Sequence, residues 1–466
     1  MRWCLLWAIA LLVSLAASAD DNWRNDVLYF VMLDRFADGD ISNNDDVDLE
    51  SALAFHGGDL KGLRDNLDEI SALGATAIWL TPITKQVDPI TSELGLFYGH
   101  HGYWADNFTE IDSRFGTEAD LKDLVDRAHE MDMRIILDVV YNHVGYDADW
   151  TRTRPEWLRL DDECGGNAET LCLSGLPDIR TELPKVREYL FDAHIGLAER
   201  TGIDGFRLDT VKHISHDFWQ EHQAAVRNRL GPEFLLLGEV WDADKYLAEP
   251  YFQRNELDAI TDFGFRDRTL KFLTGVTTAS RYSRYLSKRH TVPEGKLLAH
   301  FLSNHDMPML LAMLRGDKEK LKVAATILLT TEGLPVITWG ETVGRRGGIW
   351  PANRQDMPWG ERDVQPGTGI ERDTNLRAIF QQLIGLRRDY SAFSEEAISI
   401  VSANDRTFAF SRGSDFIVAV NGSSSSWTFD LPDADKRTWI NIFATSENTQ
   451  MNTLAPNSAA IFKRPG

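Results

Sequence analysis

Residues 205–239, GFRLDTVKHISHDFWQEHQAAVRNRLGPEFLLLGE, contain the unit from which the fold can be predicted. The unit opens with a short apolar run that ends in a carboxylate, residues 205–209, and closes with a second such run, residues 234–239. Between them, residues 215–229 have apolar side chains at helical spacing. This order of strand, helix and strand predicts a βα unit with parallel strands, because strands joined through a helix run in the same direction.

The same alternation recurs along most of the chain. Eight short apolar runs have the composition of strands, at residues 27–33, 77–81, 134–140, 205–209, 234–239, 259–263, 297–303 and 335–339. Amphipathic stretches separate most of them, for example residues 118–130, 183–200 and 215–229. Eight alternating strands favour a closed (β/α)8 TIM barrel, an α/β fold, over an open sheet. The chemically active residues follow the ends of these runs, where barrel enzymes place their active sites.

Two regions interrupt the alternation. The segment after the third strand is rich in Asp, Glu, Gly, Pro and Arg and is expected to form a small inserted subdomain. Beyond residue 392, alternating apolar runs predict a C-terminal antiparallel β-sandwich domain. The predicted division is a signal peptide at 1–19, the barrel at 20–144 and 184–392, the inserted subdomain at 145–183 and the β domain at 393–466.

The charge balance argues against nucleic-acid partners. The chain has 49 Lys and Arg against 71 Asp and Glu, a formal net charge of -22, and no clustered basic run. A phosphate-binding surface needs such a cluster, whereas a neutral sugar does not. Solubility alone is an equally simple reason for the acidity.

The first residues resemble a secretory signal peptide. Arg2 precedes an apolar stretch at residues 5–15 and an Ala-Ser-Ala site at 17–19, and no later segment is apolar enough to span a membrane. We therefore expect a secreted or periplasmic monomer without a membrane partner. In such a compartment Cys164 and Cys172 are expected to form a disulfide, with two free thiols as the alternative.

Four segments at strand ends carry the candidate chemistry. They are Asp138-Val-Val-Tyr-Asn142-His143, Gly205-Phe-Arg207-Leu-Asp209-Thr-Val-Lys212-His213, Gly238-Glu239-Val-Trp241 and Phe301-Leu-Ser-Asn304-His305-Asp306. In this order they resemble the four signature regions of the α-amylase family of glycoside hydrolases. The resemblance extends from the Asp-Arg-Phe at residues 34–36 to the C-terminal β domain.

The resemblance implies a retaining glycosidase with Asp209 as nucleophile, Glu239 as proton donor and Asp306 as the third carboxylate. Cleavage through an oxocarbenium-like transition state requires one carboxylate at the anomeric carbon and one protonated carboxyl at the leaving oxygen. Arg207 lies on the same strand face as Asp209 and is expected to keep that carboxylate ionised. Burial and nearby negative charge are expected to raise the pKa of Glu239, so that it holds a proton near neutral pH.

The family pattern also implies the side chains that contact the sugar. They are Tyr103, His143, Arg207, Lys212, His305, Trp350 and Arg354. Tyr103 is the expected stacking platform, because an aromatic face suits the C–H surface of a pyranose. Trp350 is a departure, since the family has an Asp at this place in an Asp-Pro-x-Asn-Arg stretch. The Trp350 ring either contacts sugars in place of a hydrogen bond or packs its own loop.

Two oxygen-rich clusters suggest structural calcium, at one or two sites. The first is similar to the N-terminal calcium loop of related bacterial enzymes and comprises Asp38, Asp40, Asn43, Asn44, Gly57 and Asp59. The second is the site that the family commonly places between barrel and insertion, here Asn142, Asp178 and the carbonyl of His213. Calcium prefers such oxygen ligands. A polar turn without metal is the alternative for the first cluster.

Within the family, the sequence favours a secreted α-amylase that hydrolyses internal α-1,4-glucosidic bonds of starch, glycogen and malto-oligosaccharides. Leu176-Pro177-Asp178 looks like the amylase version of the insertion motif, and the barrel begins soon after the signal peptide, without the extra domain of cyclomaltodextrinases. The alternatives are a cyclomaltodextrinase, a maltogenic amylase or a glucan transglycosylase of the same family. A catalytically silent glucan-binding protein is the alternative from another class, and the complete set of carboxylates argues against it.

Overall fold

The computed structural model describes residues 23–241, 245–289, 292–431, 439–449 and 452–465. The predicted signal peptide, residues 1–19, lies outside the described residues. In the described part of the chain, no helix is both long and apolar enough to cross a membrane.

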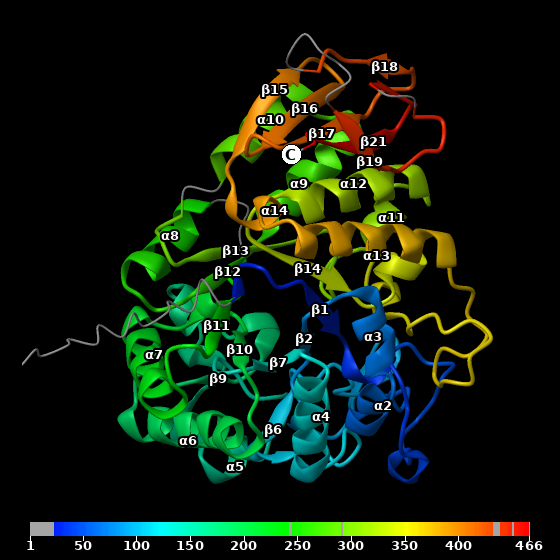
Figure 1. Ribbon diagram of the computed structural model, residues 1–466. Coiled ribbons are helices and arrows are strands. Elements are labelled where there is room, and N and C mark those ends of the chain that lie inside the picture. The colour runs from blue at the N-terminus through cyan, green and yellow to red at the C-terminus, as the bar shows by residue number, and fades with distance from the viewer. Residues whose placement is uncertain (1–22, 242–244, 290–291, 432–438, 450–451, 466) are drawn as a thin grey trace, which may run out of the picture.

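Eight parallel strands form a closed barrel, which confirms the predicted fold (Figure 1). Each strand pairs with the next along the chain, and β1 closes the ring by pairing with β14. All eight overlap the predicted runs. They are β1 (Leu28–Val31), β2 (Ala77–Leu80), β7 (Arg134–Val139), β10 (Gly205–Leu208), β11 (Leu235–Gly238), β12 (Ala259–Asp262), β13 (Leu297–Phe301) and β14 (Leu334–Thr338).

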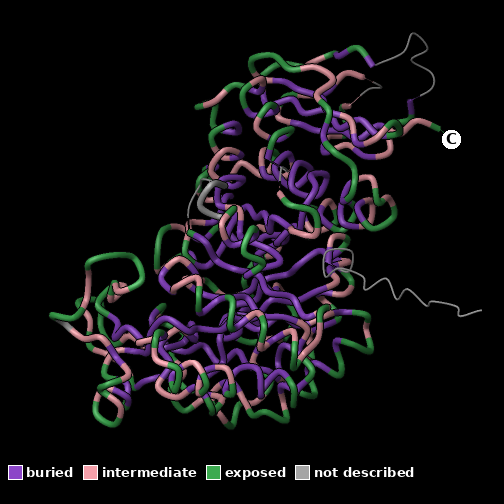
Figure 2. Tube along the Cα trace, turned by 90° about the vertical axis from the view of Figure 1, so that its left-hand side faces the viewer, coloured by how far each residue is buried: buried purple, intermediate pink, exposed green. Residues whose placement is uncertain are grey.

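The strands are buried on both faces, and this explains their composition. Every residue of β1, β2, β10, β11, β13 and β14 is buried, and Figure 2 shows the buried trace through the middle of the molecule. A parallel strand covered by helices outside and by packed side chains inside needs apolar residues at almost every position. The polar residues are therefore collected at the strand ends.

Helices follow the strands and cover the barrel. Thr117 and Asp120 form a capping box at the start of α4, Ser215 caps α7, and Gly202 ends α6 in the left-handed conformation at φ 79°. The α-helices are α2 (Leu60–Asp65), α3 (Leu67–Leu73), α4 (Glu118–Glu130), α5 (Trp150–Thr153), α6 (Pro184–Thr201), α7 (His216–Leu230), α8 (Lys245–Gln253), α9 (Phe263–Leu273), α10 (Ala279–Arg289), α11 (Leu310–Met313), α12 (Lys318–Thr330), α13 (Thr374–Asp389) and α14 (Ala392–Glu395).

Two long segments, here called excursions, lie between a barrel strand and the helix that follows it. Between β2 and α4 lie two small antiparallel pairs, β3 (Thr84–Gln86) with β6 (Ala105–Ile111) and β4 (Ile90–Ser92) with β5 (Gly95–Phe97). None of these four strands was predicted.

The second excursion lies between β7 and α6 and contains α5 and the antiparallel pair of β8 (Leu158–Arg159) and β9 (Asp178–Ile179). Within it, a disulfide joins Cys164 and Cys172, whose Cα atoms are 5.3 Å apart. This pairing agrees with the prediction from the sequence.

Short 3-10 helices connect the larger elements. They are η1 (Leu33–Arg35), η2 (Ile41–Asn43), η3 (Pro155–Trp157), η4 (Asp161–Glu163), η5 (Ala168–Thr170), η6 (Leu173–Gly175), η7 (Val211–His213), η8 (Glu341–Val343) and η9 (Ala352–Arg354).

The C-terminal part is an antiparallel sheet in the order β15-β16-β17-β21-β19, with a smaller pair, β18-β20. A separate apolar cluster that includes Phe429, Leu454 and Phe462 fills the space between the two sheets. The large sheet also packs on the barrel, through β15 and β16 against α10 and through β21 against α12. The strands are β15 (Ile398–Ala403), β16 (Thr407–Arg412), β17 (Phe416–Asn421), β18 (Trp427–Thr428), β19 (Ile440–Ala444), β20 (Thr453–Leu454) and β21 (Ser458–Lys463).

A buried ion pair joins the two parts. Arg412 of β16 donates from Nη1 to Glu332 Oε2 at 2.5 Å, and neither side chain is more than 2% exposed. Arg412 also donates to the backbone carbonyls of Ala392 and Phe393. The barrel and the β domain are therefore held by charge as well as by apolar packing.

Replacing Glu332 by Ala should lower the free energy of unfolding by about 3 to 5 kcal/mol, because the Arg412 charge is left buried without its partner. Denaturant unfolding followed by circular dichroism measures this loss. The control is Glu199→Ala, which removes a partly exposed partner of Arg229 and should cost less than about 1 kcal/mol. Equal losses in the two variants would contradict the importance of the buried pair.

Candidate active site

A cleft of 690 Å3 lies at the carboxyl ends of the barrel strands. It is walled by strand-end residues, by the excursion after β2 and by the insertion after β7. Of the ten predicted catalytic and substrate-binding residues, all but Arg207 line it: Tyr103, His143, Asp209, Lys212, Glu239, His305, Asp306, Trp350 and Arg354. The structure thus brings together side chains that are as far as 251 positions apart in the sequence.

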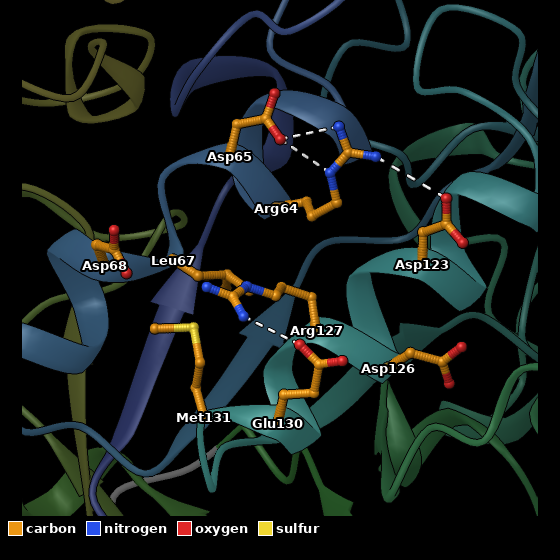
Figure 3. Close-up of a pocket in the computed structure, with 9 residues that line it drawn as sticks. All are labelled: Arg64, Asp65, Leu67, Asp68, Asp123, Asp126, Arg127, Glu130 and Met131. Atoms are coloured by element: carbon orange, nitrogen blue, oxygen red, sulfur yellow. Dashed lines mark hydrogen bonds and ion pairs between the residues drawn. The ribbon is translucent and has the colours of Figure 1, made fainter.

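A second hollow, of 520 Å3, lies between α2 and α4 on the outside of the barrel (Figure 3). Several of its charged side chains are paired with one another, for example Arg64 with Asp65 at 2.8 Å and Arg127 with Glu130 at 2.9 Å. It shares no residue with the cleft. These ion pairs, and the separation from the cleft residues, mark it as solvated surface.

Arg207 lies beneath the floor of the cleft and binds three carboxylates. Its Nη1 donates to Asp138 at 3.0 Å and to Asp209 Oδ1 at 2.7 Å, and its Nη2 lies 2.8 Å from Glu239 Oε1. The Arg207 side chain is 2% exposed. A charge-assisted network of this kind fixes Asp209 and Glu239 close to each other, since one rigid guanidinium contacts both.

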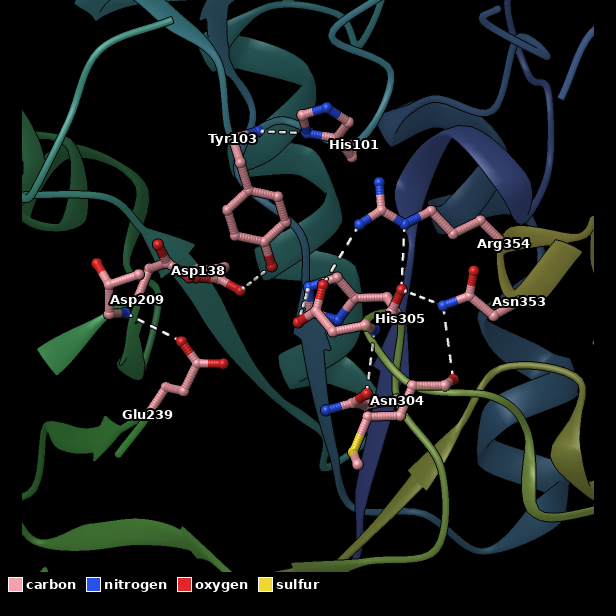
Figure 4. A network of polar contacts seen from close by, with 12 residues as sticks. His101, Tyr103, Asp138, Asp209, Glu239, Asn304, His305, Asn353 and Arg354 are labelled. Carbon is pink, nitrogen blue, oxygen red and sulfur yellow. Dashed lines mark hydrogen bonds and ion pairs between the residues drawn. The ribbon is translucent and has the colours of Figure 1, made fainter. Parts of the chain in front are cut away.

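Asp138 is a functional residue to which the sequence analysis assigned no role. It is the register partner of Arg207 on the neighbouring strand β7. It accepts a hydrogen bond from Tyr103 Oη at 2.7 Å (Figure 4). It also accepts one from Trp79 Nε1 at 3.1 Å. In the sequence it is a carboxylate inside an otherwise apolar run, and it opens one of the four segments that resemble the family's signature regions. Asp138 therefore connects the buried Arg207 to the aromatic ring above it.

Burial and charge set the protonation of the three cleft carboxyls. Burial raises the pKa of Glu239 to about 7 and that of Asp209 to about 6, against the opposing charge of Arg207. Burial also raises the pKa of Asp306, but His305, Arg354 and Arg207 outweigh it and the net shift is downward. Near pH 6.5 the proton is therefore held by Glu239, while Asp306 is ionised.

The loop after β13 is held by the segment that follows η8. Arg354 donates from Nη2 to Asp306 Oδ1 at 3.3 Å and from Nε to the His305 carbonyl at 3.1 Å. Asn353, which was not predicted, donates from Nδ2 to the same carbonyl at 2.6 Å, and Asn304 accepts from the Asp306 amide at 3.0 Å (Figure 4). These bonds fix the direction of the Asp306 carboxylate.

Tyr103 and the two histidines form one wall of the cleft. The Tyr103 ring is parallel to the His305 ring, with centroids 5.2 Å apart. His143 Nε2 is hydrogen-bonded to the Tyr103 carbonyl at 3.1 Å, and His305 Nε2 lies 3.2 Å from Asp306 Oδ2. Burial lowers the pKa of His143 to about 4 and of His305 to about 3, so both rings are neutral at ordinary pH.

Aromatic and apolar residues border the cleft on both sides of the carboxyls. Trp350, 42% exposed, lies 5.6 Å from Phe97 between ring centroids. Trp241, also 42% exposed, lies 4.7 Å from Phe263, and its carbonyl accepts from Lys212 Nζ at 2.9 Å. Phe97 and Trp241 were not predicted as contacts. Nothing in its local sequence distinguishes Phe97 from a packing residue, whereas Trp241 ends the segment that carries Glu239.

Comparison with known proteins agrees with this geometry. The model of the α-amylase catalytic domain matches residues 30–163 and 166–382. The chain belongs to the α-amylase family. The cyclomaltodextrinase of a Bacillus species is 30% identical over 439 residues, which cover 87% of this chain and 74% of that protein.

Solved structures of this family share the whole architecture. An α-amylase from Anoxybacillus has a TM-score of 0.82 and 28% identity over 95% of this chain and 99% of its own. The cyclic α-maltosyl-(1→6)-maltose hydrolase of Arthrobacter globiformis, solved with that cyclic sugar, has a TM-score of 0.79 and 26% identity over 96% and 100%. The protein is therefore a glycoside hydrolase of the amylase type.

The predicted N-terminal calcium loop has a donor set that fits a hard cation. The side-chain oxygens of Asn43 and Asn44 are buried without a hydrogen-bond partner. Asp38 lies beside them, and burial together with the Asp38 charge raises the pKa of Asp59 to about 6. Gly57 passes so close that an added Cβ would lie 2.9 Å from Asn44 Oδ1. A calcium ion bound here would neutralise the repelling carboxylates and coordinate the unpaired amide oxygens.

Two carboxylates of the predicted ligand sets are already bound by side-chain cations. Asp40 pairs with Lys61 and accepts from Ser42. Asp178 pairs with Arg159 at 2.6 Å. Among the residues that the structure describes, no group of three or more His, Cys, Asp or Glu side chains is placed to hold a metal ion. A metal at the first loop would depend on amide and backbone oxygens as well.

The pKa order predicts a bell-shaped dependence of kcat/KM on pH for a soluble malto-oligosaccharide. Activity should fall below about pH 6 as Asp209 gains a proton, and above about pH 7 as Glu239 loses one. Glu239→Gln should lower kcat by about 10^2- to 10^4-fold and remove the alkaline limb. With an activated aryl glycoside, whose leaving group needs no proton, the same variant should lose less of its kcat.

The matched control is Glu256→Gln, which alters a fully buried carboxylate that bonds His216 outside the cleft. It should retain both limbs of the profile. An alkaline limb that survives in Glu239→Gln would show that another group supplies the proton.

Proposed function

We propose that the protein is a retaining hydrolase that cleaves α-1,4-glucosidic bonds in cyclic and short linear malto-oligosaccharides. The observation that carries the chemistry is that one guanidinium, Arg207, contacts both Asp209 and Glu239. It holds an ionised carboxylate and a protonated carboxyl side by side, which is the pair that a retaining glycosidase requires. Membership of the α-amylase family supports the same reaction.

The proposed reaction has two steps. Asp209 attacks the anomeric carbon while Glu239 gives its proton to the leaving glucosidic oxygen, so the carbon–oxygen bond breaks and a glycosyl ester of Asp209 forms. Glu239, now a carboxylate, takes a proton from water, the hydroxide attacks the anomeric carbon, and Asp209 leaves as a carboxylate. Two inversions return the α-configuration.

The remaining cleft residues bind and orient the sugar in this proposal. Ionised Asp306 accepts from sugar hydroxyls, held in place by Arg354. The Tyr103 ring, fixed by Asp138, offers an aromatic face to the pyranose. Lys212, at the Trp241 side of the cleft, binds the leaving part of the substrate.

The preference for cyclic and short substrates is supported by Trp350. This residue replaces the family's Asp at the edge of the cleft and pairs with Phe97, so the edge is apolar where a hydrogen-bonding carboxylate is usual. Two of the relatives are named for cyclic sugars, the Bacillus cyclomaltodextrinase and the Arthrobacter hydrolase. These observations favour the cyclomaltodextrinase-like alternative over the starch-cleaving amylase that the sequence first suggested.

We further propose a structural calcium ion at the N-terminal loop and export of the protein from the cytoplasm. The unpaired oxygens of Asn43 and Asn44 support the ion. The disulfide between Cys164 and Cys172 supports export, because disulfides persist in oxidising compartments.

Purified protein should hydrolyse cyclomaltoheptaose with a kcat/KM at least about tenfold higher than that for soluble starch. Trp350→Asp should reduce this ratio about tenfold, because it restores a polar edge. Initial rates on the two substrates measure the ratio. Ile349→Ala is the control, since Ile349 is 76% exposed and does not line the cleft. A starch preference in the unaltered protein would reject the proposed substrate class.

The reaction itself is tested by the anomer of the product and by Asp209→Asn. NMR of early products should show the α-anomer, and the variant should lose turnover while its circular dichroism spectrum stays unchanged. Early β-anomers, or full activity in Asp209→Asn, would reject Asp209 as the nucleophile.

EDTA should lower the melting temperature by about 3 °C or more, and added CaCl2 should restore it, because an ion that binds only the folded chain stabilises it. Asn44→Ala should abolish this response. Asp46→Asn, which changes an exposed carboxylate of the same segment, should retain it. A melting temperature that EDTA does not change would contradict the proposed calcium ion.

A further inference from the structure

We propose that Arg159 takes the place of calcium at the second predicted site, and that this guanidinium pins the inserted segment to the barrel. The family resemblance places an ion between Asn142, Asp178 and the carbonyl of His213. In this chain, a side chain of the insertion already supplies the positive charge. The inference does not depend on the proposed substrate.

The first support is the geometry of Arg159. It lies on β8 directly opposite Asp178 of β9, and its side chain is 12% exposed. Nη1 lies 2.6 Å from Asp178 Oδ2 and Nη2 lies 2.5 Å from Glu182 Oε1. The planar fork of an arginine matches two carboxylates better than a lysine could.

The second support is that Asp178 is tied to the catalytic end of β7. Asp178 forms an isolated antiparallel bridge with His143, and the neighbouring Ile179 amide donates to the Asn142 carbonyl at 2.8 Å. On the other side, the Val144 amide donates to the Pro177 carbonyl at 3.1 Å. Holding Asp178 therefore holds the segment that carries His143 into the cleft.

The third support is that the residues present do not fit a dication. Asp178 is the only carboxylate of the predicted set, and calcium would have to share it with a guanidinium a few ångströms away. Of the predicted ligands, Asn142 still has a buried side-chain oxygen without a hydrogen-bond partner.

The N-terminal loop provides the contrast. Among the described residues, Asp38 and Asp59 form no ion pair with a Lys or Arg, and two amide oxygens there are unpaired. The two predicted calcium sites therefore differ: a guanidinium occupies the second, and in the described part of the chain no Lys or Arg pairs with Asp38 or Asp59 of the first. An arginine cannot be removed by a chelator, so the insertion beside the cleft should keep its place at any calcium concentration.

The test starts from Asn44→Ala, in which the N-terminal loop is disabled. Isothermal titration of this parent with CaCl2 should show no binding. Adding Arg159→Ala should lower the melting temperature by about 5 °C. It should also speed tryptic cleavage within residues 145–183 several-fold. Millimolar CaCl2 should then reverse both effects, with Asn142 and Asp178 free to bind it. The further change Asp178→Asn should abolish this rescue.

Arg159→Lys, which keeps the charge, serves if the alanine variant fails to fold, and it should retain most of the stability. Arg152→Ala is the matched control, because Arg152 belongs to the same insertion but is 67% exposed. Calcium binding by the parent would overturn the proposal, and so would an Arg159→Ala variant as stable as the parent. Failure of calcium to rescue that variant would also contradict it, since Arg159 would then not act in a cation's place.

Discussion

The active end of this barrel depends on a single buried cation. Arg207 lies inside the ring of strands and is bound by Asp138, Asp209 and Glu239 from three adjacent strands. Burying four ionisable groups is costly, and each is tolerable only while its partners remain. The strand register that places Arg207 opposite Asp138 therefore determines the positions of the catalytic carboxyls as well as the pairing of the sheet. With one positive charge among three carboxyls, one proton is best accommodated on Glu239, the carboxyl whose pKa is raised most clearly.

The outer parts of the site are fixed from that centre by hydrogen bonds between loops. Asp138 holds Tyr103, and the Tyr103 carbonyl binds His143, so the first two excursions are connected through one residue. Opposite them, Arg345 is buried over the Trp339 ring and donates to the carbonyls of Trp339 and Asn353. This ties the end of β14 to the segment that carries Arg354. These segments are thus held in position for catalysis by hydrogen bonds with the buried side chains of Asp138 and Arg345.

The sequence predicts the barrel well because its signal is local. Strands buried on both faces read as apolar runs, and a carboxylate directly after such a run is conspicuous, as at Asp209 and Glu239. What it misses depends on distant partners. Strands β3, β4 and β5 have three residues each, and the longer β6 is partly exposed without regular alternation, so none of the four shows strand periodicity. Asp138 was passed over because its partners Trp79, Tyr103 and Arg207 come from other elements. Arg159 carries no local mark at all, since its role arises only when β8 and β9 pair.

The charged centre of the cleft and its aromatic edge have different roles in the proposed function: the first in bond cleavage, the second in substrate selection. Charges around Arg207 decide how a glucosidic bond breaks, and they act on any sugar whose anomeric carbon reaches Asp209. The edge decides which sugar arrives there. A carboxylate at position 350 would bind hydroxyls in fixed directions, whereas in the proposed function the Trp350 ring would contact C–H surface over a broad area. A cyclic α-1,4-glucan is closed on itself and cannot straighten to follow a polar groove. In the proposed function, the apolar rim of Trp350 and Phe97 would favour such a ring over a linear chain, because the chain must give up conformational freedom to curve in the same way.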